Sequence, residues 1–326
     1  MAKGHKPVAG SRAYWPKKRA KRIYSSFKSN VDSSEAVPLN FACYKAGMVQ
    51  VIYTDNRKNS PTNGHDITEA VSVLECPSII VCGIKTYKKT AYGLKNTKTI
   101  WAEKLPKDLN RKTPIREKND NKKDIEQMNS DISNHFNLRL LVCTKPRDAF
   151  GKKTPELFEL NLGGKLEDKW NYAKEKLGKE IKPEEVFKEG EWTDVRAVTT
   201  GKGFQGPVKR FGVTIRGRKH EKKRRHIGNI GSVGQGRVFP GKIAMPGQLG
   251  FQTRTEYNKR VLKIGKGDIT PKGGFLKYGE VKGDYMLLHG SIPGPKKRLI
   301  MLRKAIREPS NKEPIEIKKI ILNSQQ

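Results

Sequence analysis

The stretch Gly201–Gly206 reads GKGFQG and has the spacing G-x-G-x-x-G, which binds pyrophosphate in many dinucleotide enzymes. That chemistry needs a buried strand before the glycines and a helix directly after them, whose N-terminus faces the phosphates. Residues 192–200 suit the strand, but Pro207 and the basic run after it have no apolar face for a helix. Where an acid for the ribose is expected, about 20 residues further on, the chain has His226. The spacing alone therefore does not indicate a nucleotide site.

The same glycines suit another kind of chemistry, the packing of a thin cationic loop against RNA. Residues 201–250 contain 12 glycines, which let a backbone turn sharply and approach another backbone closely. Interleaved lysines and arginines would meet RNA phosphates and release counterions. Phe204, Phe211 and Phe239 are candidates either to stack on bases or to pack locally. A merely solvated, flexible loop is the alternative, and the coincidence of loop length, glycine count and charge disfavours it.

The other titratable residues form no recognisable active site. The six histidines are scattered, and no H-E-x-x-H, G-x-S-x-G or paired-carboxylate pattern occurs. We expect His289 to be a strand residue rather than a catalytic base. The four cysteines form no C-x-x-C pair, and three lie in apolar runs, so we expect buried, reduced thiols. The sequence predicts no catalytic residue, no metal site and no cofactor.

Charge is strongly segregated along the 326 residues, whose formal net charge is +34. The first 31 residues hold nine Lys/Arg and no acid, and residues 201–260 hold 15 Lys/Arg against two acids. By contrast, residues 103–190 are nearly neutral, with 20 basic and 17 acidic side chains. Such a basic balance predicts a polyanionic partner, most simply nucleic acid. No apolar run reaches the length of a membrane span, and the basic start lacks the apolar region of a secretory signal.

Hydrophobic periodicity predicts a mainly β chain with some helix. Residues 39–56 predict a hairpin around Ala46-Gly47. The other predicted strands lie in residues 69–87 (two, broken at Pro77), 97–105, 138–146, 192–200, 256–265, 273–281, 284–292 and 297–306. The predicted helices lie in residues 122–136, 165–180 and 182–190. Strands on both sides of a long insert predict one closed or nearly closed β-barrel with an α+β insertion and a projecting loop.

Several long motifs occur in a characteristic order: FACYKAGM, GKGFQGPVKRFGV, RRHIGNIGSVGQGRVFPGK, PGQLGFQTRTEYNKRVLKIG, GGFLKYGEV and GSIPGPKKRLI. In these motifs the chain resembles the universal large-subunit ribosomal protein L-three family, and its basic start and α+β insert resemble the archaeal and eukaryotic branch. The resemblance covers essentially the whole chain. It implies a translation-factor-type β-barrel, a long basic loop directed through ribosomal RNA towards the peptidyl transferase region, and a role in early large-subunit assembly.

The resemblance also implies where RNA is bound. The family often has a Trp at the loop tip, but this chain has Val233, so tip contacts would fall to backbone, Gln235, Arg237 and Gln248. Some relatives are methylated on a loop His or Gln, and His220 and Gln248 occupy comparable stretches. The predicted rRNA-binding residues are Trp15, Lys17, Lys18, Arg19, Lys21, Arg22, Lys202, Phe204, Lys209, Arg210, Arg216, Arg218, Lys219, His220, Lys222, Lys223, Arg224, Arg225, Gln235, Arg237, Lys242, Gln248 and Arg254.

The expected organisation has six parts: a basic RNA-binding extension (1–38), the first part of the barrel (39–102), the α+β insertion (103–190), a barrel strand (191–200), the glycine-rich basic loop (201–252), and the second part of the barrel with a C-terminal tail (253–326). The predicted function is a structural constituent of the cytoplasmic large ribosomal subunit, with rRNA and neighbouring ribosomal proteins as partners and no small-molecule substrate. There are two alternatives: an RNA-modifying or nucleotide-dependent enzyme that uses GKGFQG, and a binder of anionic membranes, which the glycine and proline interruptions disfavour.

Overall fold

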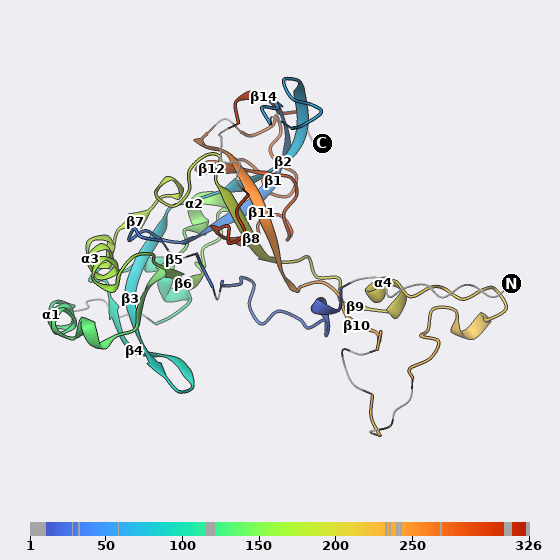
Figure 1. The fold of residues 1–326 in the computed structure, drawn as a ribbon, viewed down its shortest axis with the longest axis horizontal. Coiled ribbons are helices and arrows are strands. Elements are labelled where there is room, and N and C mark those ends of the chain that lie inside the picture. The colour runs from blue at the N-terminus through green and yellow to red at the C-terminus, as the bar shows by residue number, and fades with distance from the viewer. Residues whose placement is uncertain are drawn as a thin grey trace. The chain divides into compact units, whose positions relative to one another are not determined.

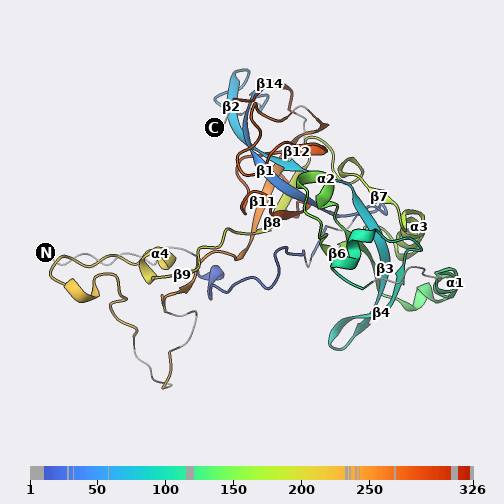
Figure 2. The ribbon, with the colours of Figure 1, turned by 180° about the vertical axis from the view of Figure 1, so that it is seen from behind.

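The computed structural model describes residues 11–27, 29–31, 33–57, 59–114, 121–231, 234, 236–238, 241, 243–267, 269–309 and 315–323. The chain divides into two compact units, each built from two separate stretches of sequence. Residues 1–23 and 198–254 form the first, which we call the loop unit, and residues 24–197 and 255–326 form the second, the sheet unit. Figure 1 shows the elements of both, and Figure 2 shows them from behind.

The sheet unit is mainly β, as predicted, and its larger sheet joins both ends of the chain. Across that sheet the order is β13 (Leu299–Lys304), β8 (Trp192–Val198), β11 (Thr253–Lys266), β12 (Asp284–His289), β2 (Asp66–Glu75), β1 (Asn40–Thr54) and β14 (Ile317–Ile321). In addition, β1 pairs with β13 in antiparallel register, from Asn40 opposite Arg303 to Tyr44 opposite Leu299. Strands far apart in sequence thus share one hydrogen-bonded system.

A smaller sheet carries the helices of the sheet unit. Its strands are β4 (Gly93–Trp101), β3 (Ile79–Thr90), β5 (Asn137–Cys143), β6 (Leu157–Asn161) and β7 (Glu180–Ile181), and β7 pairs with β3. The sequence expectation grouped residues 79–101 with the barrel, whereas their strands pair with those of the insertion. The helices are α1 (Lys122–Asp131), α2 (Pro146–Phe150) and α3 (Leu166–Lys176), with 3-10 turns at Lys107–Arg111, Ile132–Asn134 and Pro183–Glu185.

The helical spacing predicted for residues 165–180 is confirmed by α3. Acids lie in its first turn and lysines in its last, which suits the helix dipole at both ends. Trp170 and Ala173 are buried against the rest of the unit, and the Trp170 indole Nε1 donates a hydrogen bond of 2.8 Å to Asn129 on α1. The polar atom of this large buried ring is therefore satisfied.

The hairpin predicted around Ala46-Gly47 is wrong, because β1 runs through this point as one 15-residue strand. Its pairing with β2 shifts between Lys45 and Gly47, which is the signature of a β-bulge rather than a turn. Any Cβ at Gly47 would overlap the ring of Phe275. This glycine therefore serves close packing within the core, not chain reversal.

The strand predicted over residues 273–281 is also wrong, since the segment is a compact turn with a single bridge between Phe275 and Gly279. It folds around Glu75, which is fully buried. The Glu75 carboxylate accepts hydrogen bonds from the backbone N–H of Lys282 (2.9 Å) and Gly283 (3.1 Å) and from the Tyr278 hydroxyl. The turn thus brings the Tyr278 hydroxyl to one carboxylate oxygen, while the two backbone N–H groups that follow it meet the other.

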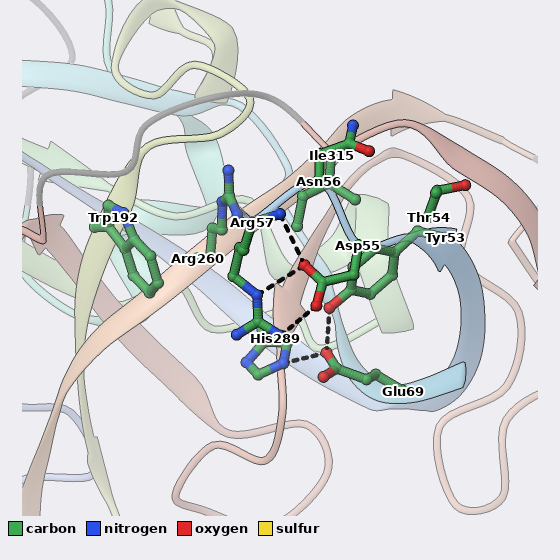
Figure 3. A pocket seen from close by; sticks show the side chains of 10 residues that line it. All are labelled: Tyr53, Thr54, Asp55, Asn56, Arg57, Glu69, Trp192, Arg260, His289 and Ile315. Carbon is green, nitrogen blue, oxygen red and sulfur yellow. Dashed lines mark hydrogen bonds and ion pairs between the residues drawn. The ribbon is translucent and has the colours of Figure 1, made fainter. Parts of the chain in front are cut away.

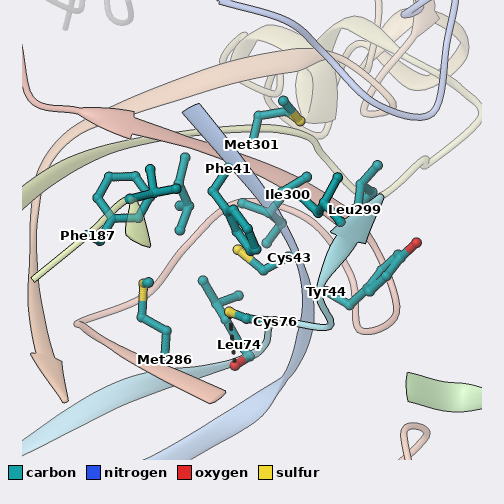
Figure 4. Close-up of a cluster of buried hydrophobic side chains, with 14 of the residues drawn as sticks. Phe41, Cys43, Tyr44, Leu74, Cys76, Phe187, Met286, Leu299, Ile300 and Met301 are labelled. Atoms are coloured by element: carbon teal, nitrogen blue, oxygen red, sulfur yellow. Dashed lines mark hydrogen bonds between the residues drawn. The ribbon is translucent and has the colours of Figure 1, made fainter. Parts of the chain in front are cut away.

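The core of the sheet unit contains the cysteines, all four of which are buried and free, as expected. Cys43 and Cys76 lie among Phe41, Leu74 and Met286 in the larger sheet (Figure 4). Burial, and then the neighbouring Cys43, raises the pKa of the Cys76 thiol. Because the thiolate is the reactive form, these buried thiols are poor nucleophiles and act as small apolar side chains.

Candidate nucleic-acid interface

The base of the loop unit is a narrow two-stranded neck. Strands β9 (Phe204–Gln205) and β10 (Gly247–Gln248) pair in antiparallel fashion. The residues that flank these two strands are also hydrogen-bonded. Lys202 N–H donates to the Leu249 carbonyl at 2.9 Å, and Thr199 N–H donates to the Gln252 carbonyl at 3.0 Å. Gly250 has a φ of +70°, and a Cβ there would overlap the Thr200 carbonyl oxygen. Glycine is needed here so that the two backbones can meet.

The glycines of GKGFQG also serve backbone geometry. Gly203 has a φ of +64°, and Gly206 precedes α4, a helix of five residues from Pro207 to Phe211. The sequence predicts no helix after Pro207, and this prediction is wrong, because α4 forms there as a single turn. Gly212, in the left-handed conformation, ends the helix. However, β9 lies between the strand β8 and this helix, and α4 is too short to offer a dinucleotide-type phosphate site.

Arg210, on α4, is an internal organiser of the loop unit. Its guanidinium donates hydrogen bonds to the carbonyls of Gln248 (3.0 Å), Met245 (2.7 Å) and Lys17 (3.0 Å). Lys17 in turn donates its ammonium to the Arg210 carbonyl at 2.6 Å. Burial lowers the pKa of both side chains, and for Lys17 the nearby Arg254 and Arg210 add to the effect. The two predicted RNA-binding segments are therefore bonded to each other.

Aromatic rings strengthen this contact between the N-terminal segment and the loop. The rings of Trp15 and Phe211 pack at a centroid distance of 4.2 Å and an angle of 48°, with the Lys17 ammonium 4.5 Å from the Phe211 ring. Arg19 lies 5.1 Å from the ring of Phe251. Phe211 thus packs locally rather than remaining available to stack on a base.

Tyr14 and Phe251 were missed by the sequence analysis. The Arg254 guanidinium lies 4.5 Å from the Tyr14 ring, and Ala20 N–H donates to the Phe251 carbonyl at 2.8 Å. The available signal was the mixture of aromatic and basic residues in SRAYWPKKRAKR, which is typical of cation–π pairs as well as of RNA contacts.

Other predicted residues are also used inside the unit. Gln248 donates from its amide to the carbonyls of Leu249 (3.0 Å) and Gly250 (3.1 Å). Arg216 donates to the Ile227 carbonyl at 3.3 Å, and its backbone N–H donates to the Arg224 carbonyl at 3.1 Å. These hydrogen bonds to backbone carbonyls stabilise the conformation of the loop. The predicted residues Gln235 and Lys242, with Val233 and Phe239, lie outside the described residues.

The remaining predicted residues form an exposed, basic surface. Of the two predicted loop aromatics that the structure describes, Phe204 is strongly exposed, at 75%, whereas Phe211 is partly buried. The exposed polar members are Lys18, Arg19, Lys21, Arg22, Lys202, Lys209, Arg218, Lys219, His220, Lys222, Lys223, Arg224, Arg225 and Arg237. Residues 11–23 and 198–254 together hold 19 Lys/Arg and one acid, Glu221. Such one-sided charge repels itself, and a polyanion would relieve the repulsion.

A cavity of about 150 Å³ in the sheet unit is a candidate small-molecule site (Figure 3). Its carboxylates are already engaged by neighbouring side chains. Glu69 accepts a hydrogen bond of 2.8 Å from the Tyr53 hydroxyl and also contacts His289 Nε2. Asp55, whose side chain is 1% exposed, forms an ion pair of 2.8 Å with Arg57. With both acids held by internal partners, the pocket offers no poised general base, and His289 lies at the end of β12 as expected.

The buried carboxylate of Asp55 makes stability depend on pH. Hydrogen bonds from Arg57, then from Thr62 and Ser60, lower its pKa well below the ordinary range. A lowered carboxyl pKa stabilises the fold above the unfolded pKa of about 4 and loses that effect as pH falls. We therefore expect Asp55→Asn to lower the melting temperature at pH 7, with a difference from wild type that shrinks between pH 4 and pH 3.

Thermal unfolding between pH 7 and pH 3 measures this effect. Asp148→Asn is a suitable control, because Asp148 is 61% exposed and its ion-pair partner Lys145 is 3.9 Å away. It should change stability little at any pH. An Asp55→Asn difference that stays constant down to pH 3 would show that the carboxylate charge is not the stabilising element.

Among the described residues, no three His, Cys, Asp or Glu side chains are grouped so as to bind a metal ion. In the same part of the chain, every helix is too short or too polar to cross a lipid bilayer.

The fold and the candidate site together indicate a binding protein whose exposed basic surface suits a polyanion. Residues 1–326 match the family described as Ribosomal protein L3. The chain is 44% identical over 322 residues to large ribosomal subunit protein uL3 of Methanothermobacter thermautotrophicus, which covers 96% of this chain and 95% of that one. It is 45% identical over 319 residues to uL3 of Methanosphaera stadtmanae (95% and 94%), and 44% identical over 313 residues to uL3 of Nanoarchaeum equitans (96% and 95%).

The chain belongs to the ribosomal protein L3 family, and the resemblance that its motifs indicated is confirmed. Members of this family are structural proteins of the large ribosomal subunit and not enzymes, which removes the nucleotide-dependent alternative for GKGFQG. The chain is accordingly a protein of the cytoplasmic ribosome, in the large subunit with its rRNA and other ribosomal proteins.

Proposed function

We propose that the loop unit binds large-subunit rRNA, and that the chain thereby supports early subunit assembly and the RNA architecture near the peptidyl transferase centre. The observation that carries this proposal is the charge of residues 11–23 and 198–254, where 19 Lys/Arg face one acid. The loop between its two neck strands is long, glycine-rich and thin, which suits a passage between RNA helices.

Within this proposal the predicted RNA-binding residues have two roles. Trp15, Lys17, Arg210, Gln248 and Arg254 make hydrogen bonds or ring contacts inside the unit and hold the N-terminal segment against the loop. The exposed cations contact phosphates, and the exposed ring of Phe204 stacks on a base. Gln235 is assigned to the tip of the loop by the family resemblance, and Lys242 is assigned to rRNA binding without a place at the tip.

We also propose that the larger sheet closes into a β-barrel of the translation-factor type, from which the insertion (103–190) and the loop (201–252) project. Its support is the pairing of six strands, β1, β2, β12, β11, β8 and β13, in which each strand pairs with two of the others. A ring of this kind leaves no free edge among those six strands. The basic segment 1–38 is assigned to RNA together with the loop.

Sedimentation of cell lysate through sucrose at low salt and at about 1 M salt tests the proposal. Surface contacts to phosphate weaken steeply with salt, whereas a chain enclosed by folded RNA stays trapped. We expect the chain to migrate with the large subunit in both gradients. Complete release at high salt would indicate a peripheral factor and would overturn the proposal that the loop is enclosed by rRNA.

A further inference from the structure

The hairpin formed by β3 and β4 extends beyond the rest of its sheet as a two-stranded ribbon (Figures 1 and 2). Pairing of β3 with β5 ends at Tyr87 opposite Asn137, whereas β3 continues to pair with β4 as far as Thr90 opposite Gly93. The Thr90 hydroxyl donates to the Gly93 carbonyl at 2.7 Å, which closes the turn. The tip, residues 88–95, is therefore ordered but has strand neighbours on one side only.

The charge of this hairpin is one-sided. Residues 85–98 contain five lysines and no acid. The two nearest the sheet are paired, Lys85 with Glu159 and Lys98 with Asp124, each at 2.8 Å. The other three, Lys88, Lys89 and Lys95, are exposed, and no carboxylate in the described part of the chain forms an ion pair with them.

The strand register places two of these lysines opposite each other, which destabilises the hairpin in the free protein. Lys88 lies directly opposite Lys95 across the two strands. Like charges at directly opposed positions destabilise an antiparallel pair. An anion bound between the two ammonium groups would convert that repulsion into attraction, so the pair suits a ligand with closely spaced negative charges.

Exposed rings accompany these lysines. Tyr92, at the turn, is fully exposed, and Phe136 is 58% exposed. The Phe136 N–H donates to the Tyr87 carbonyl at 2.8 Å, which holds this ring beside the hairpin with the Lys89 ammonium 5.5 Å from it. Lysines for phosphates beside flat rings for bases are the combination that binds unpaired nucleic acid.

We propose that the tip of the β3–β4 hairpin, residues 88–95 with Phe136, is a second RNA-binding surface of this chain and binds an unpaired stretch of rRNA. Lys88 and Lys95 contact its phosphates, and Tyr92 stacks on a base. The proposal rests on the proposed function, since it takes the partner to be large-subunit rRNA. It adds a site on the sheet unit that is separate in sequence from the basic loop and the N-terminal segment.

Equilibrium binding of the full chain to protein-free large-subunit rRNA, measured over a range of salt concentrations, tests the proposal. Lys88→Glu with Lys95→Glu should weaken binding by at least about tenfold at physiological salt and lower the salt slope by roughly 1.4, as two single-strand phosphate contacts would. Lys122→Glu with Lys123→Glu makes the same charge change at exposed lysines of α1 and should leave both quantities near wild type.

A second variant separates stacking from charge. Tyr92→Ala should weaken binding by on the order of tenfold without changing the salt slope, and Tyr92→Phe should retain wild-type affinity. Because Tyr92 is fully exposed, its replacement does not disturb the fold, and thermal unfolding checks that all variants remain folded.

The outcomes also distinguish this inference from the proposed function. If neither the wild type nor a loop variant shows salt-dependent rRNA binding, the proposed function fails. If loop variants bind weakly but the hairpin variants match the Lys122/Lys123 control, only the hairpin inference fails. If the hairpin variants bind protein-free rRNA normally and are lost from purified subunits, the hairpin contacts a protein, and RNA as its partner is overturned.

Discussion

Reversing the charges of Arg224 and Arg225 is expected to prevent stable incorporation of this chain into large subunits while its sheet unit stays folded. Both residues are exposed and follow the short 3-10 turn Glu221–Lys223. Residues 218–225 hold six Lys/Arg against Glu221. Among the described residues, no carboxylate forms an ion pair with the cations of this segment. An external anion is therefore expected to compensate most of their charge.

The size of the effect follows from the contacts removed. Hydrogen bonds to charged groups contribute about 1.5–3 kcal/mol each, so losing two lowers rRNA affinity by at least on the order of 100-fold. The dependence of log affinity on log salt should also fall by about 1.8, since each duplex phosphate contact contributes about 0.9. Equilibrium binding to large-subunit rRNA measures both quantities, and gradient sedimentation measures incorporation.

Two matched variants serve as controls for this prediction. Among the described residues, the Arg224 side chain makes a single weak hydrogen bond, 3.4 Å to the Arg216 carbonyl. Lys222→Glu with Lys223→Glu applies the same reversal at side chains that make no hydrogen bond to described residues, so it should reproduce the defect. Lys122→Glu with Lys123→Glu should not. Normal incorporation of both loop variants would contradict the assignment of the loop to RNA.

Elements whose signal is local could be predicted from the sequence. The apolar runs that became β2, β3, β5, β8, β12 and β13, and the periodic spacing that became α1 and α3, are properties of neighbouring residues. By contrast, Gly47 was interpreted as a turn, whereas it makes room for Phe275, far along the chain. The turn 273–281 depends on Glu75, more than 200 positions away, so no local pattern could reveal it.

The candidate interface likewise has features with a sequence signal and features that depend on residues far apart in the chain. Charge counted along the chain predicts its overall location, because the counts separate residues 1–31 and 201–260 from the nearly neutral residues 103–190. The internal roles of Arg210 and Lys17 could not be predicted, because their bonds join residues 193 positions apart. A basic residue that organises the loop and one that meets a phosphate have the same sequence signal, and only the positions of nearby carbonyls distinguish them.

A buried ion pair in the sheet unit, between Arg303 and Asp194, holds Phe27 and Ser29 of the N-terminal segment in place. Arg303 and Asp194 are 5% and 0% exposed, and Arg303 donates from Nε (3.0 Å) and Nη2 (2.8 Å) to the same Asp194 oxygen. A third donor, Nη1, reaches the Ser29 carbonyl at 2.6 Å, and the guanidinium lies 4.4 Å from the Phe27 ring. The other Asp194 oxygen accepts from the Asn258 N–H at 3.1 Å. One carboxylate thus orients an arginine that holds Phe27 and Ser29.

Asp194→Ala is expected to destabilise the sheet unit by about 3–5 kcal/mol, because it leaves the Arg303 charge buried without a partner. For a unit of this size that corresponds to a fall in melting temperature on the order of 10 °C. Asp66→Ala removes an exposed partner of Lys318 and should cost less than about 1 kcal/mol. Adding Arg303→Met to Asp194→Ala removes the unpaired charge and should restore part of the stability. Thermal and denaturant unfolding measure these differences, and a loss below about 1 kcal/mol for Asp194→Ala would show that Arg303 is solvated or paired elsewhere.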